Sequence, residues 1–125
     1  MKYILLFVST REDDEAFAKL PEAERMKTYG SIMKWFEDNG KSGKVIGGEE
    51  LQGVETASTI RYRNGKALVT DGPYIESKEV FGGYAIADVK SMTEAIDLAK
   101  TWPGRAVVEV RPLVDHSAVA TNAAH

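Results

Sequence analysis

The stretch KYILLFVS, residues 2–9, is apolar in both of its alternating sets of positions. Successive side chains of a strand point to opposite faces, so a strand of this kind is expected to be covered on both sides. The stretch GYAIADV, residues 83–89, shows the same pattern. Both segments are therefore predicted to be central strands of a sheet.

Two helices are predicted from their end signals. One runs from near Pro21, which suits a first helical turn, to about residues 39–40. The other opens with a capping box, Ser91 and Glu94, and stops at residues 103–104, a Pro-Gly pair. Each helix has one apolar stripe that we expect to face the core.

The stripe of the first helix comprises Met26, Tyr29, Ile32, Met33 and Phe36. That of the second comprises Met92, Ala95, Ile96, Ala99 and Trp102. Trp35 lies about 120° from the centre of the first stripe. We therefore expect Trp35 to be partly uncovered in the single chain and to mark an interface.

A hairpin is predicted in TIRYRNGKALVT, residues 59–70, because two alternating runs flank Asn64-Gly65, a pair that favours a two-residue type I′ turn. Short strands are also expected around residues 43–51 and 106–113. The order of elements is then strand, helix, strand, hairpin, strand, helix, strand. It predicts an α+β fold, a ferredoxin-like βαββαβ domain with an inserted β-hairpin.

The bulk composition describes one ordinary domain. The chain has 125 residues, 43% of them hydrophobic, which is enough for a core without disulfide or metal support. We expect a single domain over residues 1–113 and a loosely held tail over residues 114–125. The net charge of -3 argues against nucleic acid as a partner. The absence of cysteine and the short N-terminal apolar run favour a cytoplasmic protein with no membrane segment.

The candidate site is the corner TDGP, residues 70–73, after the hairpin. Alternation places Asp71 on the same hairpin face as Ile60 and Tyr62, where burial would suit it to proton transfer. An alternative is that Asp71 accepts hydrogen bonds from turn amides. Further candidate ligand-binding residues flank the corner or lie on other strands: Tyr74, Glu76, Lys78, Glu49, Glu109 and Arg111.

These further candidates also have simpler explanations. Glu76 and Lys78 could be solvated residues of a connecting loop. Glu109 and Arg111 share a strand face and could pair with each other or lie against a partner chain. The acidic run of residues 12–15 has no glycine turn or ligand spacing, so we interpret it as a solvated loop or helix start, not as a metal site.

The segment DGPYIESKEVFGGYAIADV, residues 71–89, resembles the signature of the DGPF, or DGPFAETKE, family, which is related to the YCII-like proteins. Tyr74, Ile75 and Ser77 replace the Phe, Ala and Thr of that signature. The similarity extends to MKYILL, YGSIMKWFEDNG, GGEEL and VEVRPL.

The resemblance implies a ferredoxin-like fold of the dimeric α/β barrel type, in which two chains pack sheet against sheet. YCII-like relatives have a His and Asp pair in a cleft, with the His on the first helix. Here that helix has no histidine, and His116 and His125 lie in the tail, so the chain departs from those relatives. The family is often associated with extracytoplasmic-function sigma factors and has no settled reaction.

Two functions are consistent with these features. In the first, a homodimer binds a small polar ligand in a cleft between the sheet and the first helix, with Asp71 as acid and base and Arg111 or Lys78 as an anion contact. In the second, the domain is a non-catalytic sensing or protein-interaction module associated with sigma-factor regulation. No metal and no cofactor is predicted, and the sequence leaves enzyme activity open.

Overall fold

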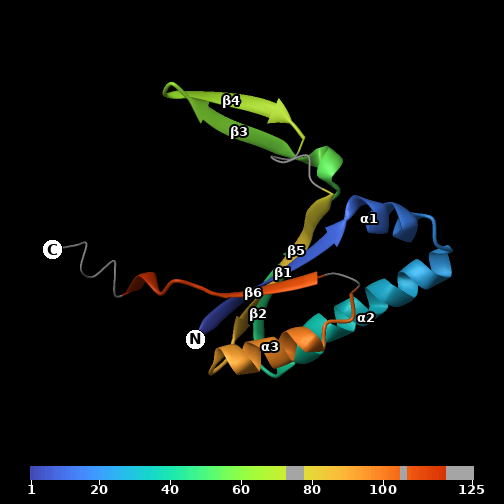
Figure 1. The fold of residues 1–125 in the computed structure, drawn as a ribbon. Helices are drawn as coiled ribbons and strands as arrows, with labels where there is room; N and C mark the ends of the chain where they lie inside the picture. Colours follow the sequence, from blue (N-terminus) through green and yellow to red (C-terminus); the bar gives the residue numbers. More distant parts are fainter. Residues whose placement is uncertain (73–77, 105–106, 118–125) are drawn as a thin grey trace.

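The structure, a computed structural model, describes residues 1–72, 78–104 and 107–117 (Figure 1). The described chain forms β1 (Lys2–Thr10), α1 (Arg11–Ala18), α2 (Glu22–Lys41), β2 (Val45–Glu50), a short 3-10 helix (Val54–Thr56), β3 (Ser58–Arg63), β4 (Lys66–Asp71), β5 (Glu79–Asp88), α3 (Met92–Lys100) and β6 (Val107–Pro112).

The main sheet has four antiparallel strands in the order β2-β5-β1-β6. Leu5 of β1 lies opposite Ala85 of β5 and Val110 of β6, so the two strands with apolar faces are central, as the pattern predicts. The fold is α+β with an antiparallel sheet and helices, consistent with a ferredoxin-like domain.

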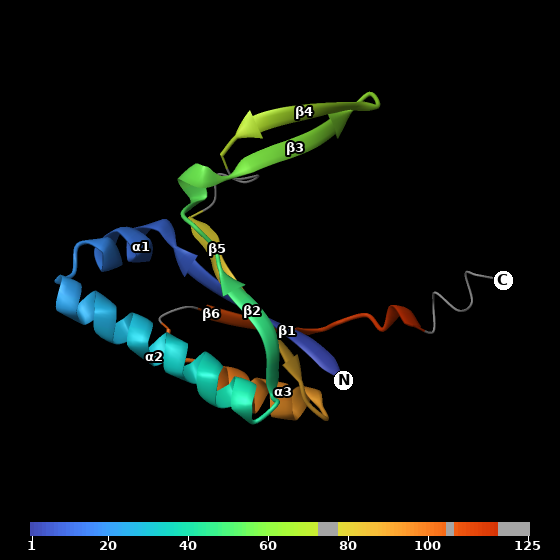
Figure 2. The ribbon, with the colours of Figure 1, turned by 180° about the vertical axis from the view of Figure 1, so that it is seen from behind.

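The core lies between one face of the sheet and the helices α2 and α3, which both pack there (Figures 1 and 2). Its buried side chains include Tyr3, Leu5 and Phe7 of β1, with Ala85 and Ala87 of β5. On the other face, the alternate residues of these strands are half-buried in the single chain. The expected covering of both faces is therefore met on the helix side only.

The position of α2 corrects two expectations from its apolar stripe. Trp35, expected to be partly uncovered, is buried with 6% exposure, whereas Met33 is 71% exposed and Met26 is also exposed. The indole N–H of Trp35 donates to the Thr101 hydroxyl at 2.8 Å, so its polar atom has a partner inside the fold. Helix α2 is rotated so that Trp35 faces the core, and this residue is not an exposed interface marker.

The acidic run after β1 forms α1. The Thr10 hydroxyl accepts the Asp13 backbone N–H at 3.0 Å and caps the helix, and the acids of its first turn lie near the positive end of the helix dipole. Their side chains are exposed, in agreement with a solvated helix start.

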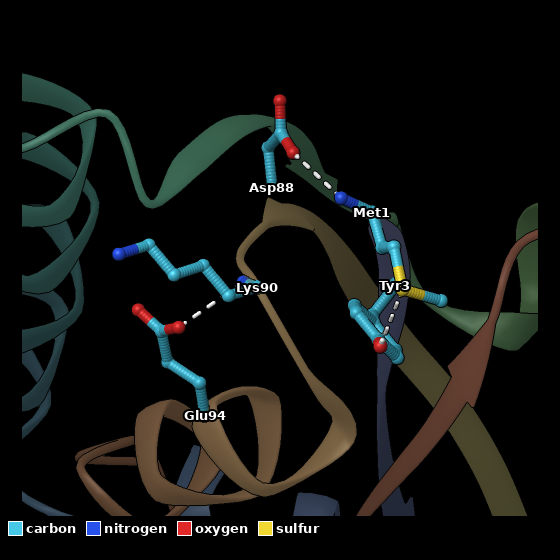
Figure 3. Close-up of polar contacts among 5 residues, drawn as sticks. All are labelled: Met1, Tyr3, Asp88, Lys90 and Glu94. Carbon is cyan, nitrogen blue, oxygen red and sulfur yellow. Dashed lines mark hydrogen bonds and ion pairs between the residues drawn. The ribbon is translucent and has the colours of Figure 1, made fainter.

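The start of α3 is fixed by polar contacts beside the chain terminus (Figure 3). The Glu94 backbone N–H donates to the Ser91 hydroxyl at 3.2 Å, as a capping box predicts. The Glu94 carboxylate accepts from the Lys90 backbone N–H at 3.1 Å instead of from that of Ser91. The Met1 amino group pairs with Asp88 at 3.4 Å and ties β1 to the end of β5.

The strands β3 and β4 form a separate two-stranded sheet that projects from one end of the main sheet (Figures 1 and 2). Ile60 lies opposite Val69 and Tyr62 opposite Ala67, which is the register that alternation about the turn predicts. Asn64 and Gly65 have φ of 53° and 76°, the positive values that a type I′ turn requires. Nearly every hairpin side chain is exposed.

The glycine pair of β2, Gly47 and Gly48, tests how closely this strand packs against β5 and α2. A Cβ on Gly48, where φ is 146°, would meet the Tyr84 carbonyl oxygen at 2.5 Å and Phe36 Cε1 at 2.9 Å. At Gly47 the nearest atom, Ile86 Cγ1, is 4.0 Å away. We expect Gly48→Ala to lower the free energy of unfolding in urea by at least about 2 kcal/mol, and Gly47→Ala to change it far less. Equal losses for the two variants would contradict this packing.

Candidate functional site

A cavity of about 200 Å³ lies between the helix-facing side of the sheet and α2, with α1 at its edge. Aromatic rings form much of its wall. Phe7 stacks on Trp102, with ring centroids 3.7 Å apart and planes 7° from parallel. Phe36 meets Trp102 edge to face at 5.9 Å. Phe17 and Tyr29 form a second edge-to-face pair, with centroids 5.6 Å apart, between α1 and α2.

Trp102 lines the cavity and carries an unpaired polar atom that solvent does not reach. Its Nε1 is buried and has no hydrogen-bond partner in the described part of the chain. The indole nitrogen of Trp35, in contrast, is bonded to Thr101. Gly104 also lines the cavity, and a Cβ there would collide with Trp102 Nε1. A buried donor without a partner costs about 1–3 kcal/mol. A ligand acceptor would relieve that penalty only after the indole ring or the Gly104 backbone moves, because the atom has almost no accessible surface in the free protein.

The polar part of the lining consists mainly of acceptors. The Ser9 hydroxyl donates to the Asp14 carboxylate at 2.8 Å, and that of Thr28 donates to the Glu24 carbonyl at 3.3 Å. Both hydroxyl oxygens retain lone pairs for a ligand donor. Asp13 of α1 adds a carboxylate to the same lining.

The end of β2 contributes two further acids, Glu49 and Glu50. Glu50 pairs with Gly83, whose strand position faces the helices, whereas Glu49 pairs with Tyr84 on the opposite face. Alternation therefore directs the Glu50 side chain toward the cavity. The described lining residues carry no Lys or Arg side chain.

Two glycines within the segment of residues 71–89 make room for this cavity. Gly82 and Gly83 lie where the β1–β5 register shifts, between Phe7 and Val8, and both line the cavity. A Cβ on Gly83 would lie 2.8 Å from the Glu49 carbonyl oxygen, so only glycine allows β2 to approach this closely.

The structure separates the residues predicted as a site. Glu49 is at the cavity, but Asp71 and Lys78 are exposed and do not line it. The burial expected for Asp71 is wrong for the single chain, because Ile60 is 56% and Tyr62 80% exposed on the projecting hairpin.

The remaining predicted residues are also outside the cavity or outside the described chain. Glu109 and Arg111 lie on the sheet face that the helices leave uncovered, with no ion pair between them within the 4.0 Å that defines one. Tyr74 and Glu76 fall in residues 73–77, which lie outside the described residues.

Sequence reasoning missed most of the cavity. It placed Trp102 on an apolar stripe and gave Ser9, Asp13 and Glu50 no ligand role. The signal that was available is the Gly82-Gly83 pair inside an otherwise apolar strand, which often marks a bulge or a close approach.

No group of three or more His, Asp or Glu side chains in the described residues is arranged to hold a metal ion. No helix in the same part of the chain is both long and apolar enough to cross a membrane.

Comparison with known proteins places the chain in a family. The model of the YCII-related domain matches residues 1–117. The chain belongs to the YCII-related family. It is 30% identical over 117 residues to an uncharacterised protein of Rhizobium meliloti (strain 1021), covering 90% of this chain and 92% of that one.

A solved structure has a similar fold. It is the 5-chloro-2-hydroxyhydroquinone dehydrochlorinase from Burkholderia phenoliruptrix AC1100 in complex with 2,5-dihydroxybenzoquinone. The TM-score is 0.53 and the identity 13%, over 91% of this chain and 94% of that chain. At this identity the likeness concerns the fold alone.

The two tryptophans of this YCII-related protein allow a direct test of the unpaired donor. Replacement of either by Phe removes the same atoms, but only Trp35→Phe breaks a hydrogen bond. We expect Trp35→Phe to lower the free energy of unfolding by about 1–3 kcal/mol more than Trp102→Phe, measured by urea denaturation without ligand. A larger loss for Trp102→Phe would indicate that its indole N–H is already paired in the free protein.

Proposed function

We propose that the cavity binds a small, neutral, flat ring that carries hydroxyl groups. The observation that carries this proposal is the buried, unpaired Nε1 of Trp102 beside a cavity walled by aromatic rings, which a ligand reaches when the indole ring or Gly104 moves. A ring hydroxyl matches such a wall, because its oxygen can accept from an N–H and its hydrogen can be donated onward.

The acceptors around the cavity can receive the hydrogen that such a ring hydroxyl donates. A ring hydroxyl bonded to Trp102 Nε1, or a second hydroxyl on the ring, could donate to Ser9 Oγ or to the Glu50 carboxylate. Aromatic walls suit a flat ring through stacked and edge-to-face contacts. The carboxylates of Asp13 and Glu50 would repel an anion. Arg111 and Lys78, predicted as anion contacts, do not line the cavity in the single chain.

The volume of the cavity and the similarity of the fold to that of the dehydrochlorinase support the same class of ligand. A cavity of about 200 Å³ is smaller than the 300–1,000 Å³ pockets that hold drug-sized molecules, and suits one small ring. The dehydrochlorinase of similar fold was solved with an oxygenated six-membered ring. A carboxylate beside a ring hydroxyl can accept its proton, so proton transfer is the chemistry that this site would add.

We propose that the protein is a cytoplasmic homodimer. The half-buried apolar face of the main sheet is the surface that sheet-on-sheet packing would cover. In such a dimer the acid–base role of Asp71 depends on groups that the second chain brings to the Asp-Gly-Pro corner, since Asp71 is exposed in one chain.

A non-catalytic interaction module, associated with sigma-factor regulation, is the second candidate. The observation in its favour is the exposed apolar side of the β3–β4 hairpin, with Ile60, Tyr62 and Val69. Trp35, the earlier candidate for this surface, is buried. The first candidate requires an open cavity, whereas an interaction module predicts a shallow or filled cleft.

Binding is tested by thermal shift and calorimetry with hydroquinone and resorcinol, with benzoate as an anionic ring of similar size. We expect the two phenols to raise the melting temperature and benzoate to leave it unchanged, because a ligand of the folded state stabilises it. Trp102→Phe should weaken phenol binding about three- to ten-fold, the worth of one hydrogen bond. Tighter binding of benzoate, or equal affinity of the variant, would contradict the proposal.

A matched pair of variants tests the carboxylate. Glu50→Gln removes the charge at the cavity, and Glu109→Gln makes the same change on the uncovered sheet face. We expect a loss of phenol affinity of about three-fold or more in the first variant only. Equal behaviour of the two variants would argue against Glu50 as a ligand contact.

Asp71→Asn tests the Asp-Gly-Pro corner separately. Unchanged folding with lost ligand binding or turnover would support a site role for Asp71. A fall in the free energy of unfolding of about 1 kcal/mol, with ligand binding unchanged, would support the turn role. Urea denaturation and calorimetry on the same preparation distinguish the two.

A further inference from the structure

The carboxylates at the cavity have no cationic partner inside the chain. Asp13 and Glu50 both line the cavity, and both residues are exposed, so their charges lie where the cavity meets solvent. Neither carboxylate takes part in an ion pair in the described part of the chain. Two negative charges at the mouth of the cavity are therefore available to a ligand.

Backbone hydrogen bonds hold the segments that carry these acids around the start of β5. The Arg11 N–H, at the beginning of α1, donates to the Lys78 carbonyl at 2.8 Å. The Leu51 N–H, directly after β2, donates to the Gly82 carbonyl at 2.8 Å. The first turn of α1 and the end of β2 are thus both attached to one short stretch of chain, so the two carboxylates border the same opening.

The rest of the lining adds no positive charge. The described lining residues carry no Lys or Arg side chain, and Arg11 and Arg25 of the adjoining helices are not among them. The start of α1 contributes about half a unit of positive charge through its helix dipole. Its first turn carries three acids, Glu12, Asp13 and Asp14, which outweigh that charge.

An aromatic ring lies at the same mouth. Tyr29 is 37% exposed, lines the cavity and meets Phe17 edge to face, with ring centroids 5.6 Å apart. The face of an aromatic ring attracts a cation that approaches it. An organic cation at the mouth would therefore meet both a carboxylate and a ring.

A metal ion fits this opening less well than an organic cation. No group of three or more acids or histidines in the described residues could hold a metal. A metal ion would also leave the aromatic wall without a role, whereas an organic cation attached to a ring uses both parts of the site.

We infer that the hydroxylated ring bound in the cavity carries a protonated amino group on a short side chain, held at the mouth by Asp13 and Tyr29, with Glu50 adding to the attraction. The inference rests on the proposed function, which concerns the uncharged ring, and adds the charge of its substituent. The ligand class is thus a hydroxyphenylalkylamine, for which tyramine is a simple probe.

Three phenols of similar size, which differ in the end of the side chain, test the charge by titration calorimetry. They are 4-ethylphenol, which is neutral, tyramine, which is a cation, and 4-hydroxyphenylacetate, which is an anion. We expect tyramine to bind about five-fold or more tightly than 4-ethylphenol, and the anion to bind more weakly than both. High salt should reduce the advantage of tyramine, because the charges at the mouth are exposed.

A matched pair of variants on α1 tests the position of the charge. Asp13→Asn removes the carboxylate that lines the cavity, and Glu12→Gln removes its exposed neighbour, which does not line it. We expect Asp13→Asn to weaken tyramine binding about three-fold or more and to leave 4-ethylphenol binding within about two-fold. Glu12→Gln should leave the binding of both ligands within about two-fold. Circular dichroism checks that each variant is folded.

The outcomes separate this inference from the proposal on which it rests. If 4-ethylphenol binds and tyramine binds no more tightly, the amino group is wrong and the proposed ring site stands. If tyramine binds more tightly but Asp13→Asn and Glu12→Gln behave alike, the assignment to Asp13 is overturned. If 2-phenylethylamine, which lacks the ring hydroxyl, binds as tightly as tyramine, the cation site is supported and the proposed recognition of a ring hydroxyl is overturned. Absence of binding by all these ligands overturns both.

Discussion

The aromatic cluster of Phe7, Trp35, Phe36 and Trp102 is the contact on which the rest of the structure depends. It joins the central strand β1, the long helix α2 and the segment after α3 in one set of ring contacts. Each such aromatic pair stabilises the fold by about 0.5–1.5 kcal/mol, in addition to the effect of burying its surface. The cavity opens beside these rings, next to Gly82 and Gly83 of β5.

The main sheet divides the molecule into two sides. On the helix side, the tight approach of β2 to β5 at Gly48 and Gly83 fixes the cavity, and Trp102 is left with a buried donor. On the other side, the apolar residues of β1 and β5 are half-buried and those of the β3–β4 hairpin are exposed. Ligand binding and association would therefore use opposite faces of one sheet and could change independently.

The sequence predicted the elements that local rules decide. Both central strands, the limits of α2 and the hairpin register follow from alternation, end signals and the Asn64-Gly65 turn. Trp35 was misplaced because an apolar stripe averages hydrophobicity, whereas the Trp35 ring packs against Phe7 and Trp102 and its N–H binds Thr101, all of them far along the chain. The surroundings of Asp71 could not be predicted, because alternation gives the face of a strand but not the direction in which a hairpin leaves the sheet.

The central claim is that the Trp102 indole N–H is an unpaired donor that a ring hydroxyl satisfies. The chain has two tryptophans, so its ¹⁵N–¹H spectrum contains two indole signals, which Trp102→Phe assigns. Saturation with hydroquinone should move the Trp102 signal downfield as its N–H gains an acceptor, while the Trp35 signal, already bonded to Thr101, stays in place. A Trp102 signal that does not move under saturating hydroquinone would contradict the account.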